Sequence, residues 1–391
     1  MRRLRDALLD VIETCLRVLP WPTEPRLVEV GKPGRGAPVL VTCNYDLTVR
    51  HVLRALRGQN AYLLVVPTRG INVWCAAAGG LFTAHQVISM LRASGIGDKV
   101  DHRRLILPQL SATGVERKLV EERTGWHIVF GPVYACDLPA YLATERKTSD
   151  MRQVRFPLHS RLEMAIAWAF PISVVCGLIL AVGWRHLVLP FVALVWGISA
   201  VLFVFFPWLH ARIWPAGQRK PGWTRYLIFF DPAIRRYLLV WVAFVVGLCV
   251  DAYGWGNGNT WRLVGWSLAG LFVVLLVSMD MAGSTPTYKS GLHEDRLLHI
   301  ELDSKACKGR AMCWEVCPKN CYLIDTHFHK AVIALPDACV QCGACVVQCP
   351  EDALAFVGLN GQRIPPQIIR AYKLNMLGQR AVGVPRGSEG P

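Results

Sequence analysis

The sequence is poor in charged residues, and acidic residues are particularly few. Only 18% of its 391 residues are charged and 53% are hydrophobic, which is unusual for a soluble protein of this size and predicts membrane-spanning segments. Lys and Arg outnumber Asp and Glu by 43 to 28. A net charge of +15 would suit nucleic-acid binding, but the sequence has no nucleic-acid motif and its basic residues surround apolar stretches. We therefore predict no nucleic-acid partner and expect membrane lipid to be the partner that explains the charge.

A disulfide framework and a secretory signal are also missing. Eight of the fourteen cysteines lie between Cys307 and Cys349, and the other six are scattered singly. This distribution favours a reducing compartment and metal binding by the cluster of cysteines. Charges such as Asp6 and Asp10 interrupt the opening segment, so it lacks the apolar core of a signal peptide. For residues 1–35 we expect an amphipathic helix and a linker, with the helix packed on the next domain or lying on the membrane surface.

Short β-rich runs alternate with helical stretches across residues 36–160. The expected strands lie at 38–42, 61–67, 104–108 and 126–133, and helices are expected to begin near Leu47, Val73 and Val115. This order predicts a wound α/β domain with a mainly parallel sheet, which binds ligands at the carboxyl ends of its strands. Polar or turn-forming residues at those ends are candidates for cofactor binding: Thr42, Asn44, Pro108 and Gln109.

Long uncharged runs follow between residues 161 and 283 and predict an α-helical transmembrane domain of about four helices. The runs cover 164–184, 187–209, 237–250 and 263–279. The connection at 210–236 is rich in Arg and Lys, so it should be cytoplasmic. An even number of spans then places both flanking domains on the cytoplasmic side of the inner membrane. A fifth span through 213–234 would separate them.

Two cysteine runs lie in residues 284–358, which we expect to form an α+β ferredoxin-like domain with two cluster sites, followed by a polar tail at 359–391. The second run, Cys339-x2-Cys342-x2-Cys345-x3-Cys349-Pro, has the full spacing of bacterial ferredoxins. Zinc is the alternative metal. Zinc ribbons, however, pair two C-x2-C knuckles and need neither the third cysteine nor the proline.

The first cysteine run keeps the same register but has Arg310 in place of its second cysteine. With the crossed ligation of two-cluster ferredoxins, one [4Fe–4S] cluster is complete and the other site is one ligand short. The expected ligands are Cys317, Cys339, Cys342 and Cys345 for the complete cluster, and Cys307, Cys313 and Cys349 for the second site. The second site could hold [4Fe–4S] or [3Fe–4S], recruit Cys321 as a substitute ligand, or bind its cluster weakly.

A single thiol surrounded by small residues stands out at 70–80, where a predicted strand leads into a helix. Alanine and glycine on one helical turn would let a large flat ligand approach the backbone, with Cys75 directed at its centre. Core packing of a lone cysteine is the alternative, and the glycines lack the spacing of a dinucleotide or phosphate-binding loop. The candidate cofactor-binding residues are Asn72, Val73, Trp74, Cys75, Ala76, Ala77, Ala78 and Gly79.

The stretch from Asn72 to Ala77 resembles the cap-helix motif of the mercury-methylating corrinoid membrane proteins. Similar stretches follow the order of that family at 38–45, 105–110, 130–133 and 151–156, and the C-terminal part is similar to the small ferredoxin partner of the same system. The chain therefore looks like the two proteins fused, and is similar to the corrinoid iron–sulfur proteins of acetyl-CoA metabolism. It departs from the family at Ala78 and Gly79, where the family has Gly and Lys, and in the absence of cysteine after residue 357.

This resemblance implies a membrane-bound corrinoid-dependent methyltransferase in which Cys75 is the catalytic residue, as the lower axial ligand of cobalt, and Asn72 and Trp74 shape the cap. The methyl group would come from a methyl-donor protein or a methyl-folate or pterin donor and pass from cobalt to Hg(II) or another soft electrophile. The fused ferredoxin, supplied by a low-potential electron donor, would reduce the cobalt again. Three alternatives are a membrane-anchored electron-transfer protein, a corrinoid methyltransferase with a different acceptor, and a reductive activator of a separate corrinoid enzyme.

Overall fold

The computed structural model describes residues 2–211, 237–254, 259–281, 298–358 and 361–371. These residues fall into two compact units. The first combines Met1–Leu19 with Phe156–His293, and the second combines Pro20–Arg155 with Glu294–Pro391. The α/β region and the ferredoxin-like region thus belong to one compact unit, although they are far apart in the sequence.

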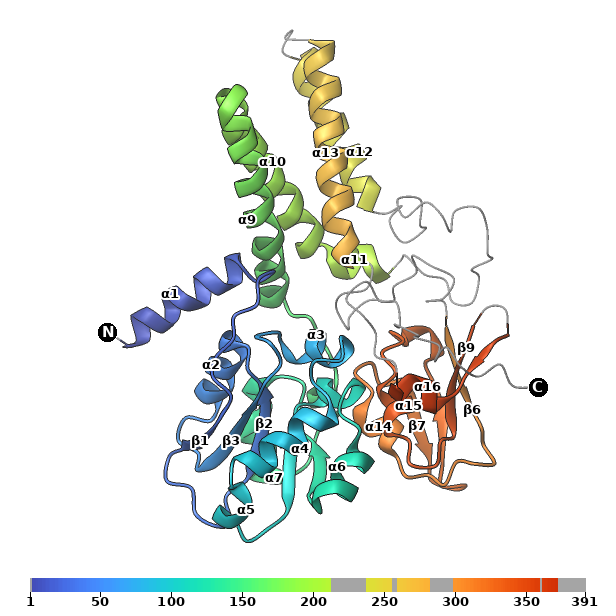
Figure 1. Cartoon of the computed structure of the whole chain (residues 1–391). Helices are drawn as coiled ribbons and strands as arrows, with labels where there is room; N and C mark the ends of the chain where they lie inside the picture. The colour runs from blue at the N-terminus through green and yellow to red at the C-terminus, as the bar shows by residue number, and fades with distance from the viewer. Residues whose placement is uncertain (1, 212–236, 255–258, 282–297, 359–360, 372–391) are drawn as a thin grey trace, which may run out of the picture. The chain divides into compact units, whose positions relative to one another are not determined.

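The second unit contains a five-stranded sheet with the strand order β1-β3-β2-β4-β5 (Figure 1). Its strands are β1 (Arg26–Val30), β2 (Val39–Cys43), β3 (Ala61–Val66), β4 (Arg104–Leu107) and β5 (His127–Phe130). Strands β2 to β5 pair in parallel, and β1 joins the edge of the sheet antiparallel to β3. The predicted wound α/β domain and its four strands are confirmed. Strand β1 was missed because it is a partly exposed edge strand in the segment that we expected to be a linker.

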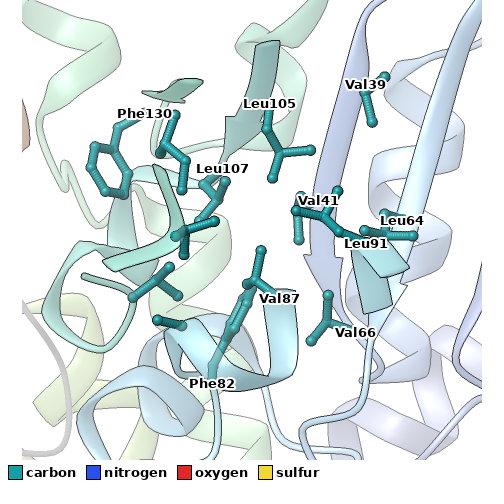
Figure 2. Packing of buried hydrophobic residues seen from close by; sticks show 14 of the residues in the cluster. Val39, Val41, Leu64, Val66, Phe82, Val87, Leu91, Leu105, Leu107 and Phe130 are labelled. Carbon is teal, nitrogen blue, oxygen red and sulfur yellow. The ribbon is translucent and has the colours of Figure 1, made fainter. Parts of the chain in front are cut away.

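Both faces of this sheet are covered, which explains the unbroken apolar runs of its strands. Figure 2 shows Val41, Leu64 and Leu107 on the face covered by Phe82 and by Val87 of α4 (Ala84–Ala93). Alternate strand residues form a second core on the other face, against α2 (Asp46–Ala55) and α7 (Leu138–Thr144). The remaining helices of the domain are α3 (Val73–Ala78), α5 (Ile96–Lys99), η1 (Gln109–Thr113), α6 (Arg117–Thr124), η2 (Ala135–Asp137) and α8 (Ser149–Arg152).

The ferredoxin-like region is built from short strands around two helical turns, one beside each cysteine run. The strands are β6 (His299–Leu302), β7 (Tyr322–Asp325), β8 (Lys330–Ile333), β9 (Leu354–Val357) and β10 (Arg363–Ile364), and the helices are α14 (Met312–Val316), η6 (Pro336–Ala338), α15 (Ala344–Gln348) and α16 (Pro366–Ala371). Strands β10, β9 and β6 form one antiparallel sheet and β7 with β8 a hairpin. The region continues past the predicted boundary at residue 358, because β10 and α16 pack against it.

The first unit consists of α1 (Arg2–Cys15) and a set of apolar helices. The apolar helices are α9 (Leu158–Gly183), α10 (Arg185–Val204), α11 (Phe206–Ala211), α12 (Tyr237–Gly254) and α13 (Thr260–Met281). Three described stretches, Leu158–Gly183, Arg185–Val204 and Thr260–Ser278, are long and apolar enough to cross a membrane, and Tyr237–Tyr253 is a shorter apolar helix. The predicted runs coincide with these helices. The proposed fifth span and most of the basic connection at 210–236 lie outside the described residues.

The N-terminal helix α1 contacts α9, and Arg17 donates a hydrogen bond to Glu163 of α9 over 3.1 Å. The expectation that this helix packs on the next domain in the sequence is therefore wrong: α1 belongs to the unit of apolar helices. Apolar side chains of α1 such as Leu8 and Val11, each 60% exposed, remain uncovered. The helix thus keeps an apolar surface after it has packed on α9.

Candidate functional site

The helix α3 begins where the chain leaves the carboxyl end of the parallel strand β3. Asn72 caps it, because the side-chain oxygen accepts a hydrogen bond from the backbone N–H of Cys75 over 2.9 Å. Ala76 and Ala77 are fully buried against the sheet, whereas the side chain of Cys75 is only half-buried. Val73, Trp74 and Ala78 are half-buried as well, and Gly79 ends the helix. The structure thus anchors α3 through its alanines and leaves the thiol on its less buried side.

The loop that leads into α3 is held by Asn44, at the carboxyl end of the neighbouring strand β2. Its side-chain oxygen accepts hydrogen bonds from the backbone N–H groups of Thr68 (2.8 Å) and Gly70 (2.9 Å), and its amide donates to the carbonyl of Thr23 (2.9 Å). Asn44 is 4% exposed, and Thr42 is buried within β2. In this structure Asn44 therefore fixes the position of α3, and neither residue presents its side chain to solvent.

Gly70 is the point at which this loop meets the segment before β1. Its φ of +69° is in the left-handed region, and a Cβ atom there would lie 2.4 Å from the backbone nitrogen of Pro22. The Gly70 carbonyl accepts a hydrogen bond from the Trp21 N–H over 3.1 Å. Only glycine combines this backbone conformation with so close an approach.

The turn η1 follows the carboxyl end of β4 and packs on α3. Its first residue, Gln109, is 1% exposed, donates to the carbonyl of Arg152 over 2.8 Å and accepts from the Lys147 ammonium over 3.4 Å. Pro108 precedes it and is half-buried. The turn ends at Gly114, where a Cβ atom would lie 2.7 Å from the carbonyl oxygen of Ala77. Gly114 thus lets η1 approach α3 closely, and the sequence pattern gave no sign of it.

The four cysteines expected to hold the complete cluster are brought together in the ferredoxin-like region. Burial, followed by the neighbouring thiols of Cys342 and Cys339, raises the pKa of the Cys345 thiol, and Cys317 contributes in the same direction. The Tyr322 hydroxyl donates to the Cys345 sulfur over 3.1 Å. Thiolates at this buried position need positive charge nearby, which the iron atoms of a cluster would supply.

The three cysteines expected at the second site line one pocket. Burial raises the pKa of Cys313 to about 12, with the charges of Cys349 and Cys307 acting in the same direction. Arg310 also lines this pocket, but its side chain is 66% exposed and forms an ion pair with Glu351 at 3.6 Å. Three thiols therefore face one space, and the side chain at the position of the missing ligand is engaged elsewhere.

Cys321 lies beside the complete set of ligands. Its backbone N–H donates to the Cys317 sulfur over 3.3 Å, and its thiol interacts with those of Cys317 and Cys339. The idea that Cys321 substitutes for the missing ligand of the second site is therefore not supported by its position. Within the described ranges no three His, Cys, Asp or Glu side chains are arranged to hold a single metal ion. Cys317, Cys339 and Cys342 lie near Cys345, and Cys307 and Cys349 lie near Cys313.

A common hydrophobic core joins the ferredoxin-like region to the α/β domain. Met312, Val316 and Ala344 belong to the core that also contains the buried face of the sheet, and Cys342 packs against it. Gln348, 5% exposed, reinforces this contact through its side-chain amide. The amide donates to the carbonyls of Ala112 and Val115 (2.7 Å each) and accepts from the Arg117 N–H (3.1 Å). These non-local contacts could not be foreseen from sequence spacing.

Comparisons with known proteins agree with this arrangement. Residues 11–142 match the family of the CO dehydrogenase/acetyl-CoA synthase delta subunit, and residues 332–355 match the 4Fe-4S binding domain. The acetyl-CoA decarbonylase/synthase complex subunit gamma of Methanopyrus kandleri is 37% identical over 128 residues, which cover 32% of this chain and 27% of the relative. The corrinoid/iron-sulfur protein large subunit of Moorella thermoacetica is 32% identical over 125 residues, which cover 32% and 28%.

The chain spans about a quarter of the length of these curated relatives. It combines a domain of the corrinoid/iron–sulfur protein type with a 4Fe–4S binding domain. The predicted relation to the corrinoid iron–sulfur proteins and the predicted ferredoxin motif are thereby confirmed.

Proposed function

We propose that this chain is a membrane-bound corrinoid-dependent methyltransferase with a built-in ferredoxin, which transfers a methyl group to Hg(II) or a related soft electrophile. The observation that carries the proposal is the placement of Cys75. It lies half-buried on a capped helix at the carboxyl edge of a parallel sheet, which is the ligand-binding edge of such folds. The domain around it is similar to the Moorella thermoacetica corrinoid/iron-sulfur protein large subunit.

The residues of α3 fit a corrinoid. Ala76 and Ala77 face the core and let α3 pack closely on η1, which leaves the less buried side of the helix, with Cys75, for a flat macrocycle. A bound corrinoid would supply the cobalt–methyl bond from which the methyl group is transferred. Cys75 would hold the cobalt, and a strongly donating thiolate there would suit methyl transfer to a soft electrophile.

The surrounding residues position this thiol. The Asn72 cap fixes the first turn of α3, and such caps are worth about 1 kcal/mol. Asn44 holds the preceding loop through its bonds to the N–H groups of Thr68 and Gly70. Gly114 lets η1 pack closely under α3. Asn44, which was predicted to contact the cofactor, thus supports the loop that leads into α3, and Gln109 belongs to the turn that packs on this helix.

The ferredoxin-like region would provide the electrons that a corrinoid needs after each transfer. The cysteines at 317, 339, 342 and 345 fit a [4Fe–4S] cluster, and the three-thiol pocket fits a second cluster with one open position. A low-potential donor would load these clusters. A methyl-donor protein, or a methyl-folate or pterin donor, would supply the methyl group.

For the apolar helices we propose an inner-membrane location with the second unit on the cytoplasmic side. Three helices of sufficient length support this, as do the apolar side chains that they expose, such as Val182 (92% exposed) and Leu189 (78% exposed). Clustered cysteines that form no disulfide among the described residues also suit a reducing compartment.

The experiment that tests the proposal compares methylmercury formation and cobalt content in cells carrying the wild type, Cys75→Ala or Cys136→Ala. Cys136 is an exposed thiol of the same domain and serves as the matched control. We expect the wild type and Cys136→Ala to form methylmercury and bind cobalt, and Cys75→Ala to form none. Cobalt binding without methylmercury in any variant would show that the acceptor is not mercury. Absence of cobalt from the wild type would favour the electron-transfer alternative.

A further inference from the structure

A segment of the α/β domain, residues 147–155, runs along the ferredoxin-like region, and we name it the docking segment. The backbone N–H of Val154 donates to the Pro318 carbonyl over 3.0 Å, and the Asn320 amide donates to the Ser149 hydroxyl over 2.8 Å. Lys147 donates to the Glu315 carbonyl over 3.3 Å. Each contact falls within five residues of Cys317, a ligand of the complete cluster.

Arg152 is a charged residue of the docking segment with little exposed surface. It is 4% exposed, and its guanidinium carbon lies 3.4 Å from the centre of the Trp314 ring. One terminal nitrogen donates to the Trp314 carbonyl over 3.1 Å. The Nε atom of Arg152 is buried and has no hydrogen-bond partner among the described residues. A buried guanidinium with an unused N–H calls for an acceptor close by.

The negative groups that act on Arg152 are Cys317 and Glu315, and Cys317 ranks first. Trp314, on which the guanidinium stacks, lies between Cys313 and Cys317 in the sequence. The Glu315 carboxylate is itself engaged by the Lys147 ammonium at 3.6 Å. The positive charge of Arg152 is therefore available to the thiolate of Cys317 and to the cluster that this thiolate would hold.

We infer that Arg152 is a positioning residue through which the α/β domain raises the reduction potential of the complete cluster. A cluster gains one negative charge when it takes up one electron from a donor. A nearby buried cation stabilises the reduced form more than the oxidised form, and the low local polarity strengthens the effect. The α/β domain would thus make the cluster easier to reduce while the two regions are docked.

This inference rests on the iron–sulfur part of the proposed function and is independent of the corrinoid and of the methyl acceptor. It can be tested on the full-length protein in detergent, loaded with iron and sulfide only. A Cys307→Ser background leaves the second site with two cysteines, so that a single cluster is titrated. The midpoint potential is then measured by a redox titration followed by electron paramagnetic resonance.

Arg152→Gln removes the charge and keeps much of the side-chain volume. We expect the ratio of reduced to oxidised cluster at a fixed potential to fall about tenfold, equivalent to about 59 mV for one electron. Arg152→Lys should retain most of the wild-type value. The matched control is Arg155→Gln, because Arg155 is an exposed residue of the same segment that pairs with Asp137. It should titrate like the wild type.

A change of less than twofold in that ratio for Arg152→Gln would overturn the inference, and so would an equal shift in Arg155→Gln. If Arg152→Gln does not retain its cluster, the potential of Trp314→Leu is measured instead. This variant releases the guanidinium from its stacked position without changing the charge. A lowered potential in Trp314→Leu supports the inference and an unchanged one overturns it. Absence of iron from the wild type would refute the proposed iron–sulfur function and the inference with it.

Discussion

The side chain of Gln348 joins the ferredoxin-like region to the turn beneath α3, and its removal should loosen that turn. Its amide makes three hydrogen bonds, two to the carbonyls of Ala112 and Val115 and one from the Arg117 N–H. A buried hydrogen bond contributes about 1 kcal/mol, and each backbone group left without a partner costs about 1–3 kcal/mol. Since water can reach part of the space left by Gln348→Ala, we expect a loss of about 2–3 kcal/mol.

Hydrogen exchange measures this loss at the place where it occurs. A loss of about 2 kcal/mol corresponds to roughly thirtyfold faster exchange if the turn opens locally. We expect that acceleration in peptides covering residues 109–117 of Gln348→Ala, including the Arg117 amide. The control is Gln367→Ala, which removes a side-chain amide that donates to the half-buried Asp352 carboxylate over 3.1 Å. Unchanged exchange in Gln348→Ala, or equal acceleration in both variants, would refute the reasoning.

Three further predictions concern the second cluster site, the helix cap and pH. Arg310→Cys supplies the missing fourth thiol to the pocket lined by Cys307, Cys313 and Cys349. The amount of iron retained after gel filtration should therefore rise, and iron should be lost more slowly in air. An iron content equal to that of the wild type would contradict this. Asn72→Ala removes the α3 cap at a cost of about 1 kcal/mol. The corrinoid should therefore dissociate several-fold faster from Asn72→Ala than from the control variant Asn320→Ala, and the absorbance of the bound corrinoid would follow its release. Burial lowers the pKa of Lys147 to about 8 from its usual 10.5. Between pH 8 and 10.5 the unfolded chain binds more protons than the folded one, so the stability of the second unit should rise with pH over about that range. Lys147→Met should remove this rise, which thermal unfolding scans at several pH values would measure. A pH dependence of stability in Lys147→Met equal to that of the wild type would contradict the prediction.

Much of the fold followed from local patterns in the sequence. The four parallel strands are unbroken apolar runs because both faces of the sheet are covered, and their short, β-rich composition indicated strands. The helix expected near Val73 proved to be two helices, α3 and α4, separated at Gly79 and Gly80. Gly80 has a φ of +76°, a left-handed conformation typical of the residue that follows a helix end.

Parts of the site could be predicted only where residues of the right chemical type occur close together in the sequence with a known motif spacing. The cysteine runs indicated which thiols gather in the ferredoxin-like region, whereas the flat-ligand site at Cys75 stays a prediction. The contacts of Asn44, Gly114, Arg152 and Gln348 join segments tens to hundreds of residues apart, so no local pattern reveals them. Asn44 and Gln109 were expected to face a cofactor, but the tertiary fold uses their amides to hold loops and the docking segment.

The expected even number of spans put the two cofactor regions on the same side of the membrane, where they could touch, but their shared core was not predicted. A long apolar insertion separates them in the chain, and separate domains were expected for 36–160 and 284–358. The structure places them in one compact unit, because Met312, Val316 and Ala344 complete a core that begins with the sheet. A ferredoxin-like region that shares such a core with the α/β domain stays docked on it. A charge such as that of Arg152 can therefore be buried between the two regions.

The central claim is that Cys75 on α3 is a ligand to the cobalt of a corrinoid, and X-ray absorption at the cobalt edge tests it most directly. The measurement compares the full-length wild type with Cys75→Ala and with the exposed-thiol control Cys136→Ala, each loaded with corrinoid. We predict cobalt–sulfur scattering in the wild type and in Cys136→Ala, and its loss in Cys75→Ala. Cobalt bound to the wild type without a sulfur neighbour would contradict the account.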